Sequence, residues 1–273
     1  MSKPVLYTFH LSIWSAAADL ARIELGLIDK VDAKGVNVLE GENLSPEFLK
    51  INPGATVPVL VSDGVLYDDT TATIDYMIAI SAVKIARRTP LTAAVHDDSL
   101  DPNFMLRSAR NEDDVARKAG GKGAIATRLA RIKEYGALPS AVPFQEHFDR
   151  RDATFSTMLD VFNGTASESV KQAFFATSQA NYDAAKTFVL DTLPAAIKEG
   201  PFVAGAGPGE DDLHVAAWLF RAARSAGAVK EREGIEAFER WFGTAVPEKI
   251  KVLWSAWVVR DSWKTVYPDG TLH

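Results

Sequence analysis

Residues 52–76, Asn-Pro-Gly-Ala-Thr-Val-Pro-Val-Leu-Val-Ser-Asp-Gly-Val-Leu-Tyr-Asp-Asp-Thr-Thr-Ala-Thr-Ile-Asp-Tyr, decide the fold. Two apolar runs, 57–61 and 65–67, flank Ser62, Asp63 and Gly64. An Asp-Gly pair between apolar runs is a strong hairpin signal, because these two residues tolerate the left-handed backbone that a tight turn needs. The stretch therefore predicts a β-hairpin followed by a helix over about 70–83.

The residues before this hairpin complete a small α/β unit. A strand is expected at 5–9, a helix at 12–26 that ends at a glycine, and a second strand at 36–39. Ser45 followed by Pro46 has the pattern of a helix start, with a capping side chain and proline in the first turn. The order strand, helix, strand, hairpin and helix is typical of a compact α/β domain.

From about residue 90 onward the pattern is helical, and no convincing strand is found. We expect two domains, 1–85 and 86–273, the second including an atypical segment at about 90–145 that contains several glycines and prolines. Helices are expected at about 103–118, 127–135, 146–163, 166–193, 211–226, 230–242 and 247–266.

The charge balance is acidic, with a formal net charge of −6 at pH 7. Nucleic-acid binding usually depends on a basic surface, so no nucleic-acid partner is expected. The basic residues of 87–122 alternate with acidic ones, and we interpret them as a solvated face. They are Arg87, Arg88, Arg107, Arg110, Arg117, Lys118 and Lys122.

The chain has no cysteine, which excludes a disulfide framework, a cysteine metal site and a catalytic protein thiol. Four of the five histidines, His96, His147, His214 and His273, are scattered with no metal-ligand spacing, so no metal is expected. No apolar stretch resembles a signal peptide or a membrane span, which predicts a cytoplasmic protein without a membrane partner.

Three blocks, in this order, resemble the glutathione transferase superfamily. They are 52–60, with its Asn-Pro and Val-Pro-Val-Leu; 69–77, with an acidic residue, Thr-Thr-Ala and Tyr-Met; and 212–218, Asp-Leu-His-Val-Ala-Ala-Trp. The likeness is to serine-type members, theta-like or fungal-type. It implies a thioredoxin-like N-terminal domain and an all-helical C-terminal domain, with 90–160 almost unmatched and therefore expected to hold an insertion.

The resemblance assigns the glutathione contacts. Val57 and a cis Pro58 meet the cysteinyl part of the tripeptide, in the manner of an added strand. Asp69 and Thr70, at the start of a helix, meet the γ-glutamyl group. At the glycyl end, Asn43 and Thr56 stand where serine-type members carry a histidine and a lysine. Both are uncharged, which implies either weaker binding or help from another cation such as Lys50.

A catalytic hydroxyl is expected at the start of the first helix. A free thiol has a pKa of about 8.5, and both a hydroxyl donor and a helix N-terminus favour the thiolate. Ser12 occupies the family's serine position, and Ser15 is the alternative. Tyr7 is a third possibility, although its place in a strand should turn it away. His10 and Trp14 are expected to form walls of the electrophile pocket.

The expected activity is conjugation of glutathione, a co-substrate, to hydrophobic electrophiles. Two alternatives within the same fold stay open: a serine-type glutathione-dependent peroxidase or etherase, and a ligand-binding or regulatory member without turnover. The resemblance also implies a homodimer. The block at 212–218 is interpreted as structural: His214 as a core residue, and Asp212 as a helix cap that is incomplete because Gly209 has no side chain.

Overall fold

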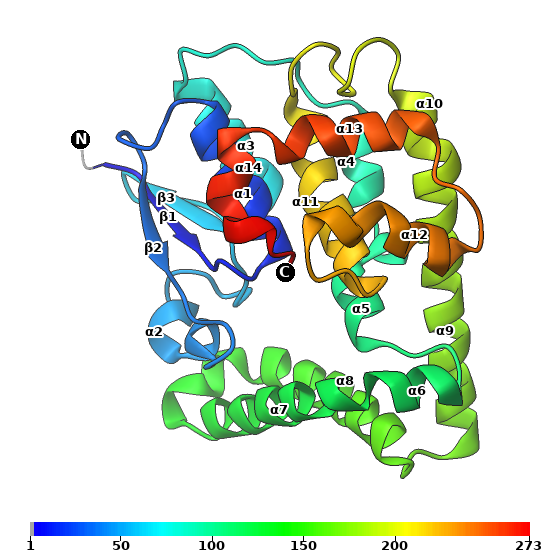
Figure 1. The fold of residues 1–273 in the computed structure, drawn as a ribbon. Coiled ribbons are helices and arrows are strands. Elements are labelled where there is room, and N and C mark those ends of the chain that lie inside the picture. The colour runs from blue at the N-terminus through cyan, green and yellow to red at the C-terminus, as the bar shows by residue number, and fades with distance from the viewer. Residues whose placement is uncertain (1–2) are drawn as a thin grey trace.

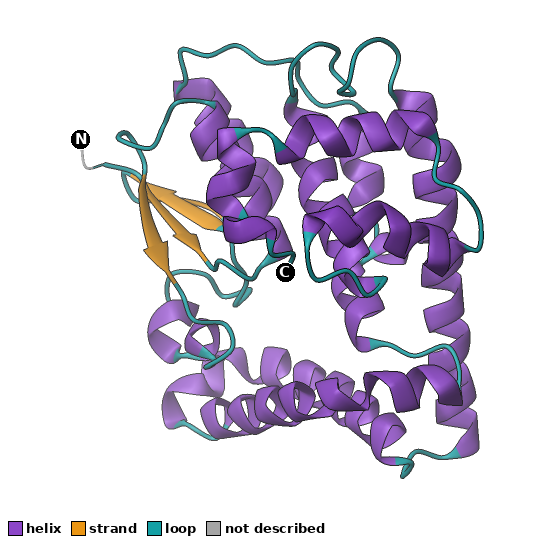
Figure 2. Ribbon diagram, in the orientation of Figure 1, coloured by secondary structure: helices purple, strands orange, loops and turns teal. Residues whose placement is uncertain are grey.

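The N-terminal part is a four-stranded sheet in the computed structural model, which describes residues 3–273. The strands are β1 Val5–Thr8, β2 Asp32–Gly35, β3 Val59–Ser62 and β4 Val65–Tyr67. Their order across the sheet is β2-β1-β3-β4, with β1 parallel to β2 and β3 antiparallel to β1 and β4. The sheet lies on one side of the molecule, and helices make up most of the rest (Figure 2). Helices α1 (Ile13–Glu24) and α3 (Thr70–Ile80) cover one face. This is the thioredoxin-like domain that the sequence predicts.

The hairpin between β3 and β4 is confirmed. Asp63 and Gly64 both take the left-handed backbone, with φ of 46° and 80°. Val61 pairs with Leu66 across the turn, so the two apolar runs lie side by side as expected.

The second strand lies at Asp32–Gly35, so its prediction at 36–39 is wrong. All four residues of β2 are exposed, because it is an edge strand with no helix over it. Edge strands carry charged residues such as Asp32 and Lys34, and a search for apolar runs does not find them. The apolar Val36 follows the strand and packs with Phe48 and Val59 on the other face of the sheet.

The remaining chain is helical, apart from two isolated bridges, as predicted. A short helix, α2 (Pro46–Leu49), is capped by Ser45 as expected. The later helices are α4 Pro90–Val95, α5 Pro102–Arg107, α6 Glu112–Lys118, α7 Lys122–Gly136, α8 Gln145–Asn163, α9 Glu168–Thr187, α10 Leu193–Ala196, α11 Glu210–Ser225, α12 Gly234–Phe242, α13 Glu248–Val258 and α14 Asp261–Val266.

Three predicted helices are interrupted. The helix expected at 103–118 is two helices, since Asn111 takes an extended backbone and caps α6 through its side chain. The helix expected at 247–266 breaks at Val259 and Arg260 into α13 and α14. The one expected at 166–193 ends in a π-helical turn, Phe188–Thr192, before α10.

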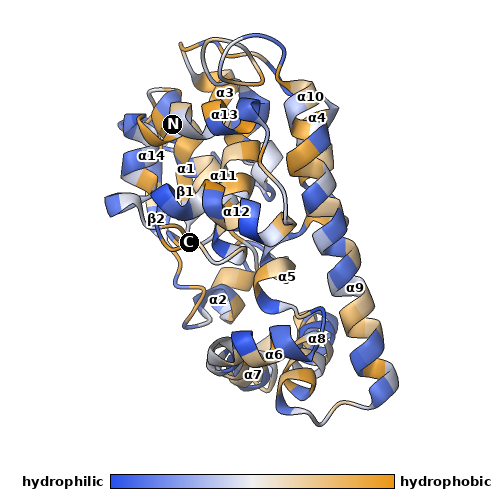
Figure 3. Cartoon of the chain, turned by 45° about the vertical axis from the view of Figure 1, so that its right-hand side comes forward, coloured by the Kyte–Doolittle hydropathy of each residue, from blue (hydrophilic) through white to orange (hydrophobic). Residues whose placement is uncertain are grey.

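The segment expected to be atypical is folded. Helices α7 and α8 pack antiparallel and lie with α6 as a layer below the sheet and the central helices (Figure 1). The long α9 runs from this layer along one side of the molecule to the central helices (Figure 3). That the segment is an insertion stays a prediction.

Helix α11 is the centre of the molecule. Almost every residue from Glu210 to Ser225 is buried, and the helix packs against α1, α4, α5 and α12. Trp218 is fully buried, and its indole Nε1 donates to the Leu100 carbonyl over 2.7 Å. The helix therefore joins the sheet domain to the later helices through one continuous apolar core.

Asp212 caps this helix and also holds the loop before it. Its carboxylate accepts hydrogen bonds from the backbone N–H groups of Gly209, Val203 and Ala204 at 2.7–3.0 Å. Gly209 occupies the N-cap position, so only the Asp212 half of the reciprocal cap is made, as the sequence predicts. The structural interpretation of this block is supported.

The basic residues of 87–122 are not simply a solvated face. Arg88 bonds the fully buried Glu210 at 2.6 Å and Asp75 at 2.5 Å, so it ties the segment before α4 to α11 and α3. Lys118 donates to the Met105 and Ser108 carbonyls at 2.7 Å. The interpretation as a solvated face is wrong for Arg88 and Lys118. Arg88 pairs with residues distant in sequence, and Lys118 bonds backbone carbonyls; neither kind of partner is visible in a local charge pattern.

We expect Asp212→Ala to lower the free energy of unfolding by about 2–5 kcal/mol, because the N–H of the buried Gly209 and those of two loop residues, Val203 and Ala204, would lose their acceptor. Urea denaturation followed by circular dichroism measures this change. Asp261→Ala is the matched control: Asp261 is also in the first turn of a helix but fully exposed, and its loss should cost less than about 0.5 kcal/mol. Equal losses would contradict the capping role.

Candidate functional site

The strand register brings three predicted site segments to one end of the sheet. Tyr7 in β1 pairs with Val59, and Leu60 pairs with Tyr67 at the end of β4. The Val57-Pro58 bond, which is cis as expected, therefore lies beside the end of β1 and the start of the loop to α3. The Val57 backbone makes no hydrogen bond within residues 3–273 and is half-buried. The backbone N–H and C=O of Val57 are therefore free to pair with an extended peptide, in the manner of an added strand.

Ser12 stands at the start of α1 on this side of the sheet. It is the N-cap, with φ −90° and ψ 126°, and its Oγ accepts a long hydrogen bond from the Ser15 N–H at 3.4 Å. The side chain is half-buried. Its hydroxyl proton is not used within the described chain, so it can be donated to a ligand.

Ser15 is placed differently. It is fully buried, and its Oγ accepts from the Phe9 N–H at 3.1 Å. The bond fixes the loop between β1 and α1, which is a structural task. Of the two candidate serines, Ser12 is therefore the accessible one and Ser15 is not.

Three aromatic or imidazole side chains were also candidates. Tyr7 packs edge-on against Phe48, with centroids 6.0 Å apart, on the sheet face opposite α1. His10 is exposed. Trp14 is half-buried and stacks on His96 of the segment after α4, at 3.8 Å and 23° between planes. Of these three side chains, Trp14 is the one that contacts the helical part of the chain, through His96.

The start of α3 is capped by Asp69, whose Oδ1 accepts from the Ala72 N–H at 2.7 Å. Thr70 is the first helical residue and is buried, so its side chain is less accessible to a ligand than that of Asp69. Asp69 is exposed and its carboxylate can meet a ligand ammonium while it caps.

The two uncharged residues expected at the glycyl end have partners already. Asn43 is buried, and its Nδ2 donates to the Ala55 carbonyl at 2.6 Å. Thr56 is exposed, and its Oγ1 accepts from Asn52 at 3.0 Å. Lys50 is exposed.

Arg128 of α7 was missed by sequence reasoning. Its Nη1 donates to the Val38 carbonyl at 2.7 Å and to Asn43 Oδ1 at 3.1 Å. A cation therefore lies next to the predicted glycyl position, although 85 residues separate it from Asn43. No local pattern could have indicated this contact.

A pair formed by the half-buried His96 and the buried His214 was also missed. His96 Nε2 lies 2.8 Å from His214 Nδ1, and burial lowers the pKa of His96 to about 4 and that of His214 to about 3. Both rings are neutral at neutral pH. The interpretation of His214 as a satisfied core residue holds for Nδ1 only, because its Nε2 is buried without a partner in the described chain.

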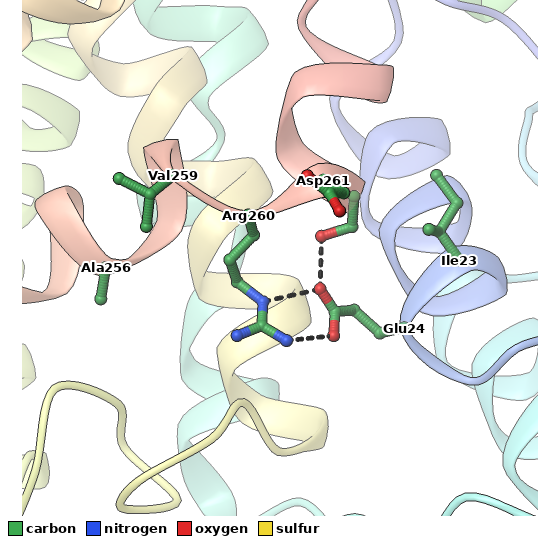
Figure 4. Close-up of a pocket in the computed structure, with 7 residues that line it drawn as sticks. Ile23, Glu24, Ala256, Val259, Arg260 and Asp261 are labelled. Carbon is green, nitrogen blue, oxygen red and sulfur yellow. Dashed lines mark hydrogen bonds and ion pairs between the residues drawn. The ribbon is translucent and has the colours of Figure 1, made fainter.

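One open cavity lies away from Ser12, at the C-terminal end of α1 (Figure 4). It is an open notch of about 470 Å³ between α1 and the junction of α13 and α14. Its charged groups bond one another: Arg260 pairs with Glu24 at 2.6 and 2.7 Å, and Ser262 also donates to Glu24. We interpret it as a joint between the two parts of the chain.

The described residues contain neither a cluster of metal-binding side chains nor a membrane-spanning helix. Within 3–273, no three or more His, Cys, Asp or Glu side chains are grouped so that they could hold a metal ion. In the same residues, no helix combines the length and apolarity needed to cross a bilayer.

Comparison with known proteins identifies relatives of the N-terminal part. The family model for the glutathione S-transferase N-terminal domain matches residues 6–83. Over 73 residues the chain is 36% identical to glutathione S-transferase D7 of Drosophila melanogaster, a match that covers 27% of this chain and 32% of the relative. The chain thus spans about a third of the length of the first curated relatives it matches.

Solved structures resemble the whole chain. Gtt2 from Saccharomyces cerevisiae is 19% identical with a TM-score of 0.55, over 96% of this chain and 99% of that one. A glutathione transferase homologue from Sulfitobacter, solved with bound glutathione, is 20% identical with a TM-score of 0.50, over the full length of both. At these identities the likeness shows the fold, including the all-helical C-terminal region.

The histidine pair predicts a loss of stability in acid. Each histidine has a pKa of about 6.5 when unfolded and a lower one when folded, so between pH 6.5 and 4 the unfolded state binds more protons. The free energy of unfolding should therefore fall as the pH drops through this window. Urea titrations at pH 4.5–7.5 should show a shallower fall for the double variant His96→Gln, His214→Gln; an unchanged slope would contradict the assignment.

Proposed function

We propose that this chain is a member of the glutathione transferase superfamily and that it transfers glutathione to an electrophile, with the Ser12 hydroxyl stabilising the glutathione thiolate. The observation that carries the proposal is the position of Ser12: it caps α1 next to the free Val57 edge of the sheet. The curated relatives named glutathione S-transferases and the homologue solved with glutathione support the choice of co-substrate.

The geometry accounts for activation of the thiol. A peptide laid along Val57 as an added strand has its central residue beside the loop that leads to Ser12. The N-terminus of α1 carries a partial positive charge, and the Ser12 O–H is a donor; both favour the thiolate over the thiol. Ser12 Oγ accepts from the Ser15 N–H, and its own O–H has no acceptor within the described chain, so the proton is free to be donated to the thiolate.

The rival donors fit less well. Ser15 has no exposed surface and is held by the Phe9 N–H. Tyr7 packs on Phe48 across the sheet from α1. Ser12 is the one of the three hydroxyls that is both exposed to a ligand and at the helix N-terminus.

The reaction would be a nucleophilic substitution or addition. The thiolate sulfur donates its electron pair to an electrophilic carbon and an S–C bond forms. In a substitution the leaving group departs with its bonding pair; in an addition the π pair of the attacked double bond moves to the neighbouring atom, which takes up a proton. Since the chain has no cysteine, a mixed disulfide between the protein and glutathione cannot form. Trp14 is proposed as one wall of the electrophile pocket, and His10 as a residue at its rim. A homodimer and a cytoplasmic location are part of the same proposal.

We expect Ser12→Ala to lower the rate of conjugation with a generic aryl halide by about 10²-fold, because one donor to the developing anion is lost. The pKa of the bound thiol, read from thiolate absorbance, should rise at the same time. This readout is clean since the protein itself has no thiol.

Ser15→Ala is the matched control, with the same atoms removed three residues away. It should destabilise the β1–α1 loop but leave the pKa of bound glutathione nearly unchanged. Equal rates for the parent and Ser12→Ala would remove Ser12 from its role. Glutathione binding without turnover in any variant would favour a carrier.

A further inference from the structure

Three arginines near the proposed glutathione site have no carboxylate partner. They are Arg107 at the end of α5, Arg128 in α7 and Arg151 in α8. Within residues 3–273, no Asp or Glu oxygen lies within 4.0 Å of any of them. Other arginines of the same region do have such partners: Arg110 and Arg117 pair with Asp114, and Arg131 pairs with Glu40 and Glu134.

The three charges act on one another. Burial and the charges of Arg151 and Arg107 lower the pKa of Arg128 to about 9, and burial with the charge of Arg107 lowers the pKa of Arg151. Arg107 lies over the Phe155 ring of α8 at 5.8 Å, which places it against the same helix as Arg151. Asp101 offers Arg107 a charge interaction but no ion pair.

Such an arrangement is unfavourable without an anion. Burial costs a charged group free energy, and like charges add to that cost. Arg107 is in contact with solvent, but the protein packed around it still lowers the pKa of its guanidinium. Arg128 and Arg151 are half-buried. Arg151 makes no hydrogen bond within the described chain, and Arg128 uses only Nη1. Donors are therefore available to a ligand.

The contacts of α7 place this cluster beside the glutathione loop. Arg128 bonds Asn43, which in turn bonds the Ala55 carbonyl, two residues before Val57. Leu44, Leu49 and Ala55 of this loop share one apolar cluster with residues of α7 and α8. The helix pair is thus packed onto the segment that would receive the glycyl end.

We propose that Arg107, Arg128 and Arg151 form a carboxylate-binding subsite that takes the glycyl carboxylate of glutathione. The inference rests on the proposed function, since it assumes that glutathione lies along Val57. With the γ-glutamyl group at Asp69, the glycyl end points to the opposite side of Val57, which is the side of Asn43 and Thr56. These two residues are neutral, and α7 and α8 supply the missing charge.

Neighbouring charges do not offer a better site. Arg131 is neutralised by two glutamates, and Arg150 is exposed. Burial and the nearby arginines lower the pKa of His147 to about 4, so it is neutral and adds no cation. Its buried Nε2 has no partner within the described chain. The subsite is therefore limited to the three arginines.

The test compares glutathione with its analogue in which the glycyl carboxylate is a primary amide, by isothermal titration calorimetry. The parent protein should bind the acid about 10- to 100-fold more tightly, since charge-assisted hydrogen bonds are lost in the amide. Arg128→Met and Arg151→Met should each reduce this preference by about tenfold and leave amide binding nearly unchanged. Arg128→Lys should keep part of it.

Arg150→Met is the charge-matched control and should keep the full preference for the acid. Thermal unfolding identifies any variant that fails to fold; Arg151→Met is the safer one, because no hydrogen bond of the described chain is lost. The proposal is overturned if the parent binds acid and amide equally, or if the variants weaken both ligands alike. If neither ligand binds, the proposed function fails as well, whereas conjugation with equal binding of the two ligands removes the subsite alone.

Discussion

Three consecutive carboxylates at the start of α11 hold together parts of the chain that are far apart in sequence. Glu210 bonds Arg88, and Asp211 accepts from the N–H groups and hydroxyl of the turn at Thr89 and Thr92. The Asp212 carboxylate accepts a hydrogen bond from the Val203 N–H in the loop before the helix. Buried carboxylates are tolerated only when such donors surround them. The positions of α3, α4 and α11 thus depend on one helical turn.

The geometry of the proposed site depends on the position of α11, which these three carboxylates fix. Helix α11 packs along α1, and Arg221 of α11 donates to the carbonyl of Leu11, the residue before Ser12. Two hydrogen bonds therefore fix the N-terminus of α1: the one from Arg221 of α11 to Leu11, and the one from the Phe9 N–H to Ser15 Oγ. A hydroxyl that orients a thiolate must be held in place, and both supports are buried.

Sequence reasoning succeeded where the signal is local. The turn at Asp63, the cap at Ser45 and the half-cap at Asp212 each depend on residues within four positions, and each is confirmed. It failed for β2, which is exposed at a sheet edge and has no apolar pattern. Helix breaks at 108–111 and 259–260 were missed because neither stretch contains the proline or glycine that usually marks a helix end.

The candidate site divides in the same way. Ser12, Val57 and Asp69 could be placed from motif and spacing, and the register brings their segments together. Arg128 could not, because its contact with Asn43 spans 85 residues and depends on how α7 is packed. Long-range polar contacts carry no periodic signal. They appear only once the packing is known.

The seating of α7 and α8 on the loop around Asn43 has an evolutionary consequence. Since the loop and the helix pair share an apolar cluster, changes in the pair alter the loop without touching any residue of the sheet domain. Substitutions in α7 and α8 can therefore reshape the proposed glycyl site while they lie outside residues 6–83, which the family model matches. A comparison limited to those residues would not reveal such substitutions.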